Sequence, residues 1–174
     1  MGKARRSIQI IIFALIAAVG GWTLYTNLFA GTEKPVVGAA APNFKLSSLD
    51  GVTRELSDYK GKVVVVNFWG TFCEPCRNEM PALDRQQTKW KDSGVVVLGL
   101  NLDEPRITVD NYIRQVGVTF PILFDKDEQM RKRYGVSQYP TTFFIKPDGR
   151  IGEIRIGEMD EAYIDRTIAA MLKP

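Results

Sequence analysis

Short apolar runs alternate along the chain with segments in which apolar residues recur at helical spacing. The apolar runs predict buried strands at 63–68, 95–100 and 121–124. The first of them is largely β-branched, which is typical of a strand that is covered on both faces. The helical spacing predicts helices at 74–91, 108–116, 128–134 and 161–172.

Two pairs of short segments are joined by turn residues and predict hairpins. The first pair is 44–46 and 52–54, and the second is 141–145 and 151–156 with Pro147, Asp148 and Gly149 between them. Strands that alternate with helices favour an α/β fold, to which the second hairpin adds an antiparallel edge.

The amino-terminal segment from 8 to 30 carries no charged residue and, as a helix, is long enough to cross a hydrocarbon core of about 30 Å. Lys3, Arg5 and Arg6 precede it. The positive-inside tendency then predicts a cytoplasmic tail at 1–7, a membrane anchor at 8–30 and an extracytoplasmic remainder. A cleaved signal peptide is an alternative, although its cleavage site would be poor because Leu28 is not small. A second alternative is that the segment forms a buried helix of a soluble protein.

The remaining chain divides into a linker at 31–42, rich in Gly, Ala and Pro, and a domain at 43–174. A length of 174 residues with 45% hydrophobic and 25% charged residues suits one globular domain. The net charge of +3 equals the contribution of Lys3, Arg5 and Arg6. The domain therefore has no excess of basic residues, and we predict no nucleic-acid partner.

The cysteines are two in number, Cys73 and Cys76, and they lie where the strand at 63–68 passes into the helix at 74–91. Cysteines at this spacing can form and reopen a disulfide, and a helix amino terminus stabilises a thiolate. A zinc site would need further Cys or His ligands, and the chain has no other Cys and no His. A structural disulfide closing so short a loop would stabilise little. The pattern favours a redox-active pair with no metal and no other cofactor.

The residues around the pair suggest separate roles. Cys73, at the helix start, is the expected attacking thiolate, and Cys76 resolves the mixed disulfide. Pro75 suits the first helical turn. Glu74 places a negative charge beside the thiols, although a carboxylate is also favoured there for the helix alone. Glu79 lies one turn beyond Cys76 and is the nearest candidate for moving its proton; the alternative is a solvated helix residue.

The motif Phe68-Trp69-Gly70-Thr71-Phe72-Cys73-Glu74-Pro75-Cys76-Arg77, with Pro81 and the downstream Tyr139-Pro140-Thr141-Thr142, resembles the thioredoxin superfamily. With the anchor, the chain is most similar to the membrane-tethered TlpA/ResA-like branch. The resemblance implies a thioredoxin-like fold with an amino-terminal β-hairpin and a helix–strand insertion. It also implies reduction of the heme-binding cysteines of apocytochrome c, with electrons from a CcdA-type membrane thiol transporter.

The same resemblance assigns roles to individual residues. It implies that Glu74, together with Pro75, tunes the redox potential, and that Glu79 is functional. It identifies Pro140 as the cis-proline beside the dithiol. Trp69, Phe72 and Tyr139 are expected to contact the substrate, although Trp69 suits a core position equally well.

Other functions use similar residues. A DsbA-type thiol oxidase runs the same exchange in reverse, and a general disulfide reductase lacks the dedicated substrate; the sequence does not set the direction. A Sco-type copper chaperone would need Cys-x-x-x-Cys and a His, and a peroxiredoxin a Thr-x-x-Cys; neither pattern occurs around Cys73.

Overall fold

The computed structural model describes residues 2–29 and 34–173, which fall into two compact units, Met1–Glu33 and Lys34–Pro174. The first unit contains one helix, α1 (Gly2–Phe29). Within the described residues, none of the helices combines the length and apolarity that crossing a membrane requires. The anchor at 8–30 therefore stays a prediction, and its last residue, Ala30, lies outside the described residues.

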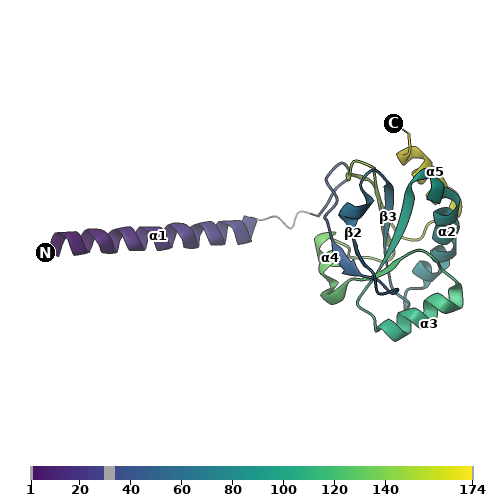
Figure 1. Ribbon diagram of the computed structural model, residues 1–174, viewed down its shortest axis with the longest axis horizontal. Coiled ribbons are helices and arrows are strands. Elements are labelled where there is room, and N and C mark those ends of the chain that lie inside the picture. The colour runs from purple at the N-terminus through teal and green to yellow at the C-terminus, as the bar shows by residue number, and fades with distance from the viewer. Residues whose placement is uncertain (1, 30–33, 174) are drawn as a thin grey trace. The chain divides into compact units, whose positions relative to one another are not determined.

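The second unit is built on a five-stranded sheet with the order β5-β4-β3-β6-β7 (Figure 1). Three strands are mutually parallel, and β6 and β7 run antiparallel to their neighbours. The strands are β3 (Val63–Trp69), β4 (Val95–Asn101), β5 (Ile122–Phe124), β6 (Thr141–Ile145) and β7 (Ile151–Ile156). The predicted α/β class and antiparallel edge are confirmed, and each predicted strand is present within one residue of its expected bounds.

Helices cover both faces of this sheet. Met80 of α2 (Glu74–Trp90) and Ile164 of α5 (Glu161–Met171) share one core with Val65 of β3. Met130 of α4 (Gln129–Arg133) shares the opposite core with Val66. Figure 1 shows α2 and α5 on one side of the sheet and α4 on the other. Because both faces are covered, every residue of β3 is buried, as its β-branched composition predicted.

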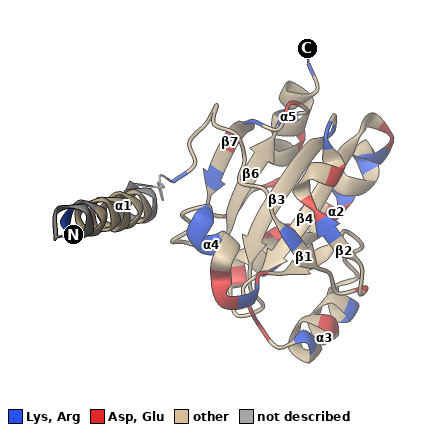
Figure 2. Ribbon diagram, turned by 60° about the vertical axis from the view of Figure 1, so that its left-hand side comes forward, with Lys and Arg blue, Asp and Glu red and all other residues tan. Residues whose placement is uncertain are grey.

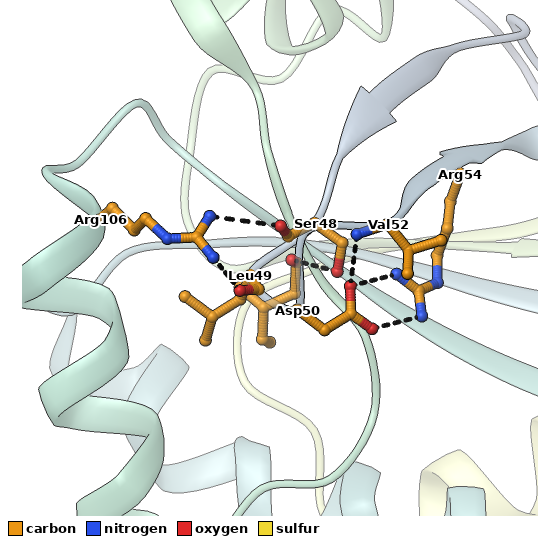
Figure 3. Close-up of polar contacts among 7 residues, drawn as sticks. Ser48, Leu49, Asp50, Val52, Arg54 and Arg106 are labelled. Carbon is orange, nitrogen blue, oxygen red and sulfur yellow. Dashed lines mark hydrogen bonds and ion pairs between the residues drawn. The ribbon is translucent and has the colours of Figure 1, made fainter.

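The amino-terminal hairpin is β1 (Lys45–Ser47) paired with β2 (Thr53–Glu55), as predicted. Its turn is attached to the rest of the domain by polar contacts (Figure 3). The Arg106 guanidinium, at the start of α3 (Arg106–Val116), donates to the carbonyl oxygens of Ser48 and Leu49. The Ser48 hydroxyl donates to the Ile122 carbonyl at 2.9 Å. The turn is thereby held against α3 and β5.

Residues 31–33 of the predicted linker at 31–42 lie outside the described residues, and the rest belongs to the compact unit Lys34–Pro174. The Gly38 and Ala41 amides donate to the carbonyl oxygens of Ile151 and Gly149, and the Ile151 amide donates to Ala39. All three bonds join backbone groups, so the segment can bind to the domain although its sequence has no regular spacing of apolar residues. The division into a linker at 31–42 and a domain at 43–174 stays a prediction, with residues 38–41 bound to the turn and strand that follow β6.

The helix α4 begins at Gln129, one residue later than predicted, because Asp127 and Glu128 adopt left-handed backbone with φ of 58° and 52°. Its first amides are bound by the buried carboxylate of Asp125, at 2.8 Å from Met130 N and 2.7 Å from Arg131 N. Acidic and basic residues follow one another here, as the adjacent red and blue ribbon near α4 shows (Figure 2).

Replacing Asp125 should therefore destabilise the domain. In Asp125→Ala the amides of Met130 and Arg131 lose their acceptor, and we expect the free energy of unfolding to fall by about 2–4 kcal/mol. Asp148→Ala is the matched control, because Asp148 is exposed and accepts a single amide bond, from Arg150. Urea denaturation of both variants gives the comparison. Equal losses in the two would contradict the capping role of Asp125.

Candidate active site

The dithiol lies at the carboxyl end of β3, where the chain turns into α2. Cys73 and Cys76 form a disulfide with a Cα–Cα distance of 5.3 Å. Cys73 is the N-cap residue of α2, and its sulfur accepts the Cys76 amide at 3.2 Å. The sulfur thus sits at the positive end of the helix dipole, which favours the thiolate once the disulfide is reduced.

The two cysteines differ in exposure. Cys73 is 9% exposed, whereas Cys76 is completely buried. The exposed surface of the pair therefore belongs to Cys73 alone. Glu74 and Pro75 form the exposed first turn of α2, so the carboxylate charge lies on the solvent side of the pair.

An aromatic pair from two distant segments lies beside Cys73. Phe72 is 67% exposed, and its ring meets that of Tyr139 edge-on with 6.4 Å between centroids. The ring of Phe72 also lies over Gly70, where a Cβ would come within 2.4 Å of it. The Tyr139–Pro140 peptide bond is cis, as predicted. The structure therefore brings together Phe72, Cys73 and the cis-proline segment.

Trp69 needs a correction, because it is fully buried and cannot line a substrate surface. It ends β3, which is covered on both faces, and its ring packs against Tyr112 with 5.6 Å between centroids. Of the two positions weighed for this residue, the core position is the one observed. Among the described residues, no cluster of three or more His, Cys, Asp or Glu side chains is arranged to hold a metal ion.

Glu79 is buried, with 1% of its surface exposed, and is held by two donors. Asn67 Nδ2 lies 2.7 Å from Oε1, and the Met159 amide lies 3.1 Å from Oε2. The solvated alternative for Glu79 is thus excluded. Burial raises the pKa of Glu79 to about 8, against the lowering effect of the Asn67 and Met159 bonds. At neutral pH the carboxyl group is therefore mostly protonated.

Several residues that contact the site were not singled out from the sequence. Asn67 also donates to the Thr142 hydroxyl at 2.9 Å, so the buried network joins β3, α2 and β6. A polar residue within the apolar run of β3 was an available signal for Asn67. Glu104 accepts bonds from Thr71 in the turn before Cys73. It lies in a distant loop, and no local pattern marks it.

A thioredoxin-like sheet with a disulfide at the start of the helix after its central strand defines a class, the thiol-disulfide oxidoreductases. Residues 37–154 match the model of the AhpC/TSA family, and the chain belongs to this thioredoxin-like family. It is an enzyme of the thiol-disulfide oxidoreductase type.

Individual relatives agree with this assignment. The thiol-disulfide oxidoreductase ResA of Bacillus subtilis (strain 168) is 44% identical over 154 residues, covering 88% of this chain and 86% of that one. ResA of Bacillus thuringiensis (strain Al Hakam) is 41% identical, with 95% of each chain covered. A crystal structure of a thiol:disulfide interchange protein of the thioredoxin family from Chlorobium tepidum TLS matches with a TM-score of 0.73 at 29% identity. That match covers 79% of this chain and 99% of the other.

The buried Glu79 should make stability depend on pH. The folded carboxyl has a pKa of about 8, against a reference value of 4.5 for the free group. Between these values the folded state binds more protons than the unfolded state, so the free energy of unfolding falls as pH rises. In Glu79→Gln this loss is absent. Between pH 4.5 and about 8, the free energy of unfolding of the variant should therefore rise by a few kcal/mol relative to that of the wild type, at about 1.4 kcal/mol per pKa unit.

Urea denaturation of the oxidised protein at a series of pH values measures this difference. Glu161→Gln is the control, because a hydrogen bond from Arg85 lowers the pKa of that exposed carboxylate, so its proton is already lost throughout the interval. If the free energy of unfolding depended on pH in the same way for the wild type and Glu79→Gln, the raised pKa of Glu79 in the folded state would be contradicted.

Proposed function

We propose that the enzyme acts as a reductase of protein disulfides outside the cytoplasmic membrane, with Cys73 as nucleophile and Cys76 as resolving thiol. The observation that supports these roles is the asymmetry of the pair. Of the two residues, Cys73 alone retains exposed surface, at 9%, and it lies at the helix amino terminus, whereas Cys76 is completely buried. An incoming disulfide can therefore reach Cys73 and not Cys76.

The exchange proceeds in two steps that start from the reduced dithiol. The Cys73 thiolate attacks a substrate sulfur, which forms a mixed disulfide and releases the other substrate sulfur as a thiolate. The Cys76 thiolate then attacks Cys73 Sγ, which releases the second substrate thiolate and forms the Cys73–Cys76 disulfide. Two electrons pass to the substrate, and no cofactor besides the cysteine pair takes part.

In its ionised form, Glu79 is proposed to accept the proton of Cys76 so that the Cys76 thiolate can attack in the second step. A free thiol has a pKa of about 8.5, close to the value of about 8 for Glu79, so transfer between the two groups costs little free energy. The residues are one turn apart on α2, and both are buried. Glu74 and Pro75, on the exposed first turn, are proposed to tune the redox potential.

The proposed substrate is the disulfide of the heme-binding Cys-x-x-Cys-His segment of apocytochrome c. The resemblance to ResA-like proteins supports this choice. Phe72 and Tyr139 are proposed as the contact surface. The cis Pro140 is buried, and its proposed part is to present the backbone before it, with which an extended peptide can pair. A CcdA-type membrane thiol transporter is the proposed electron donor that returns the pair to the dithiol.

The substrate can be identified by trapping. Cys76→Ser cannot resolve the mixed disulfide, so a partner should stay covalently attached to Cys73 and be identifiable by mass spectrometry. Cys73→Ser is the control and should trap nothing, with turnover lost. Recovery of a c-type apocytochrome would support apocytochrome c as the substrate. Recovery of a broad set of exported proteins would indicate a general disulfide reductase.

The direction of electron flow follows from the redox potential of the pair. A reductase requires a potential well below that of strong oxidants such as DsbA, at about −120 mV. Equilibration with glutathione or dithiothreitol buffers measures it. A value near that of DsbA would replace the reductase assignment with a thiol oxidase.

The amino-terminal segment is proposed to anchor the enzyme in the membrane. Its described side chains include large apolar residues that are exposed on α1, such as Ile11, Phe13 and Trp22 at 57%, 74% and 71%. The full chain should therefore remain in membranes after a carbonate wash, and protease added outside the cell should digest the domain. Release by carbonate, or recovery of a shortened chain without residues 1–30, would contradict an uncleaved anchor.

A further inference from the structure

The turn that presents Phe72 and Cys73 is held from outside by one carboxylate. Glu104 Oε2 accepts the Thr71 amide at 2.7 Å, and Glu104 Oε1 accepts the Thr71 hydroxyl at 2.5 Å. These bonds join segments 33 residues apart in sequence. Hydrogen bonds to a charged acceptor are about twice as strong as neutral ones, so a two-point contact of this kind restrains the turn effectively.

Glu104 is itself fixed by the end of β4. Asn101 Nδ2 donates to Glu104 Oε2 at 2.7 Å, and the Glu104 amide donates to Asn101 Oδ1 at 3.1 Å. Asn101 is completely buried and belongs to the sheet. The carboxylate is thus bound to a rigid element on one side and to the turn before Cys73 on the other.

The backbone between Asn101 and Glu104 supports the same geometry. Asp103 adopts left-handed backbone with φ of 52°, a conformation that is unfavourable for a residue other than Gly. The adjacent Leu102 amide donates to the Trp69 carbonyl at 3.2 Å, which ties this loop to the last residue of β3. The chain reversal at Asp103 lies between two contacts with the segment that leads to Cys73.

We propose that Glu104 is a positioning residue for the thiol-disulfide exchange, which holds the Thr71–Cys73 turn so that Cys73 Sγ stays over the amino terminus of α2 and Phe72 stays beside Tyr139. The proposal rests on the function proposed above, in which Cys73 attacks. Thr71 directly precedes Phe72 and Cys73 in the chain. Bonds that fix the Thr71 amide and hydroxyl therefore restrain the positions of the Phe72 ring and the Cys73 sulfur.

The test uses the reduced full-length protein and two readouts. The first is the rate of Cys73 alkylation by iodoacetamide as a function of pH, which reports the thiol without any disulfide substrate. The second is the second-order rate constant with an oxidised Cys-x-x-Cys-His peptide. Glu104→Ala should lower the peptide rate by about tenfold or more, as expected when a reacting group is misplaced. Its alkylation midpoint should move to higher pH, because the sulfur leaves the helix amino terminus.

Two further variants separate position from charge. Thr71→Val keeps the carboxylate and removes one of its bonds, so its alkylation midpoint should also move upward. Glu104→Gln retains one acceptor oxygen and should give an intermediate peptide rate. Glu161→Ala is the control, because Glu161 likewise accepts bonds from two residues, Arg85 and Gln86, and should leave both readouts unchanged.

Three results would overturn the positioning role of Glu104. The first is wild-type behaviour of Glu104→Ala in both readouts. The second is a midpoint that moves downward in Glu104→Ala and not at all in Thr71→Val, which would mean that Glu104 acts by its charge alone. The third is that Glu104→Ala and the control Glu161→Ala lower the peptide rate and move the alkylation midpoint by equal amounts, which would mean that the effect is not specific to Glu104. If the wild-type protein leaves the peptide oxidised, the proposed reductase function fails, and the alkylation profiles still decide the role of Glu104.

Discussion

The complete burial of β3 is the constraint on which the rest of this structure depends. Both faces of the strand carry β-branched or aromatic residues, so helices must cover it on one side and the hairpin with α4 on the other. A strand enclosed in this way can present functional groups only at its ends. The dithiol follows its carboxyl end directly, and a packed scaffold therefore fixes the place where the chain can reach solvent with a reactive sulfur.

Asn67, the polar residue within the apolar run of β3, makes it possible for a carboxyl group to lie inside the domain. Asn67 faces the α2 side of the sheet and provides one of the two donors to the buried Glu79, the other being the Met159 amide. Asn67 Oδ1 finds no hydrogen-bond partner among the residues that the structure describes. A buried carboxyl with a raised pKa is costly for the fold, and such groups are concentrated where an enzyme needs a proton carrier. The network reaches β6 through Thr142, two residues beyond the cis-proline.

Local patterns were sufficient to predict most of the fold and the centre of the site. The strand at 63–68, the helix after it, both hairpins and the cysteine pair each depend on neighbouring residues, and each was found. Contacts between distant segments left no such pattern. The bonds that Thr71 donates to Glu104 join two polar residues in separate loops, and the docking of residues 38–41 uses backbone groups. Trp69 was ambiguous because an aromatic residue suits both a core and a contact surface.

The docking of residues 38–41 has a defined place on the sheet. These residues bond to the chain between β6 and β7, beside Ile145, which pairs with Val64 near the beginning of β3. The cysteines lie after the other end of that strand, about 20 Å away at the usual rise per residue. Residues 38–41 therefore dock near one end of β3, and the cysteines follow the other end. The docking bonds and the exposed surface around Phe72 do not compete for the same part of the domain.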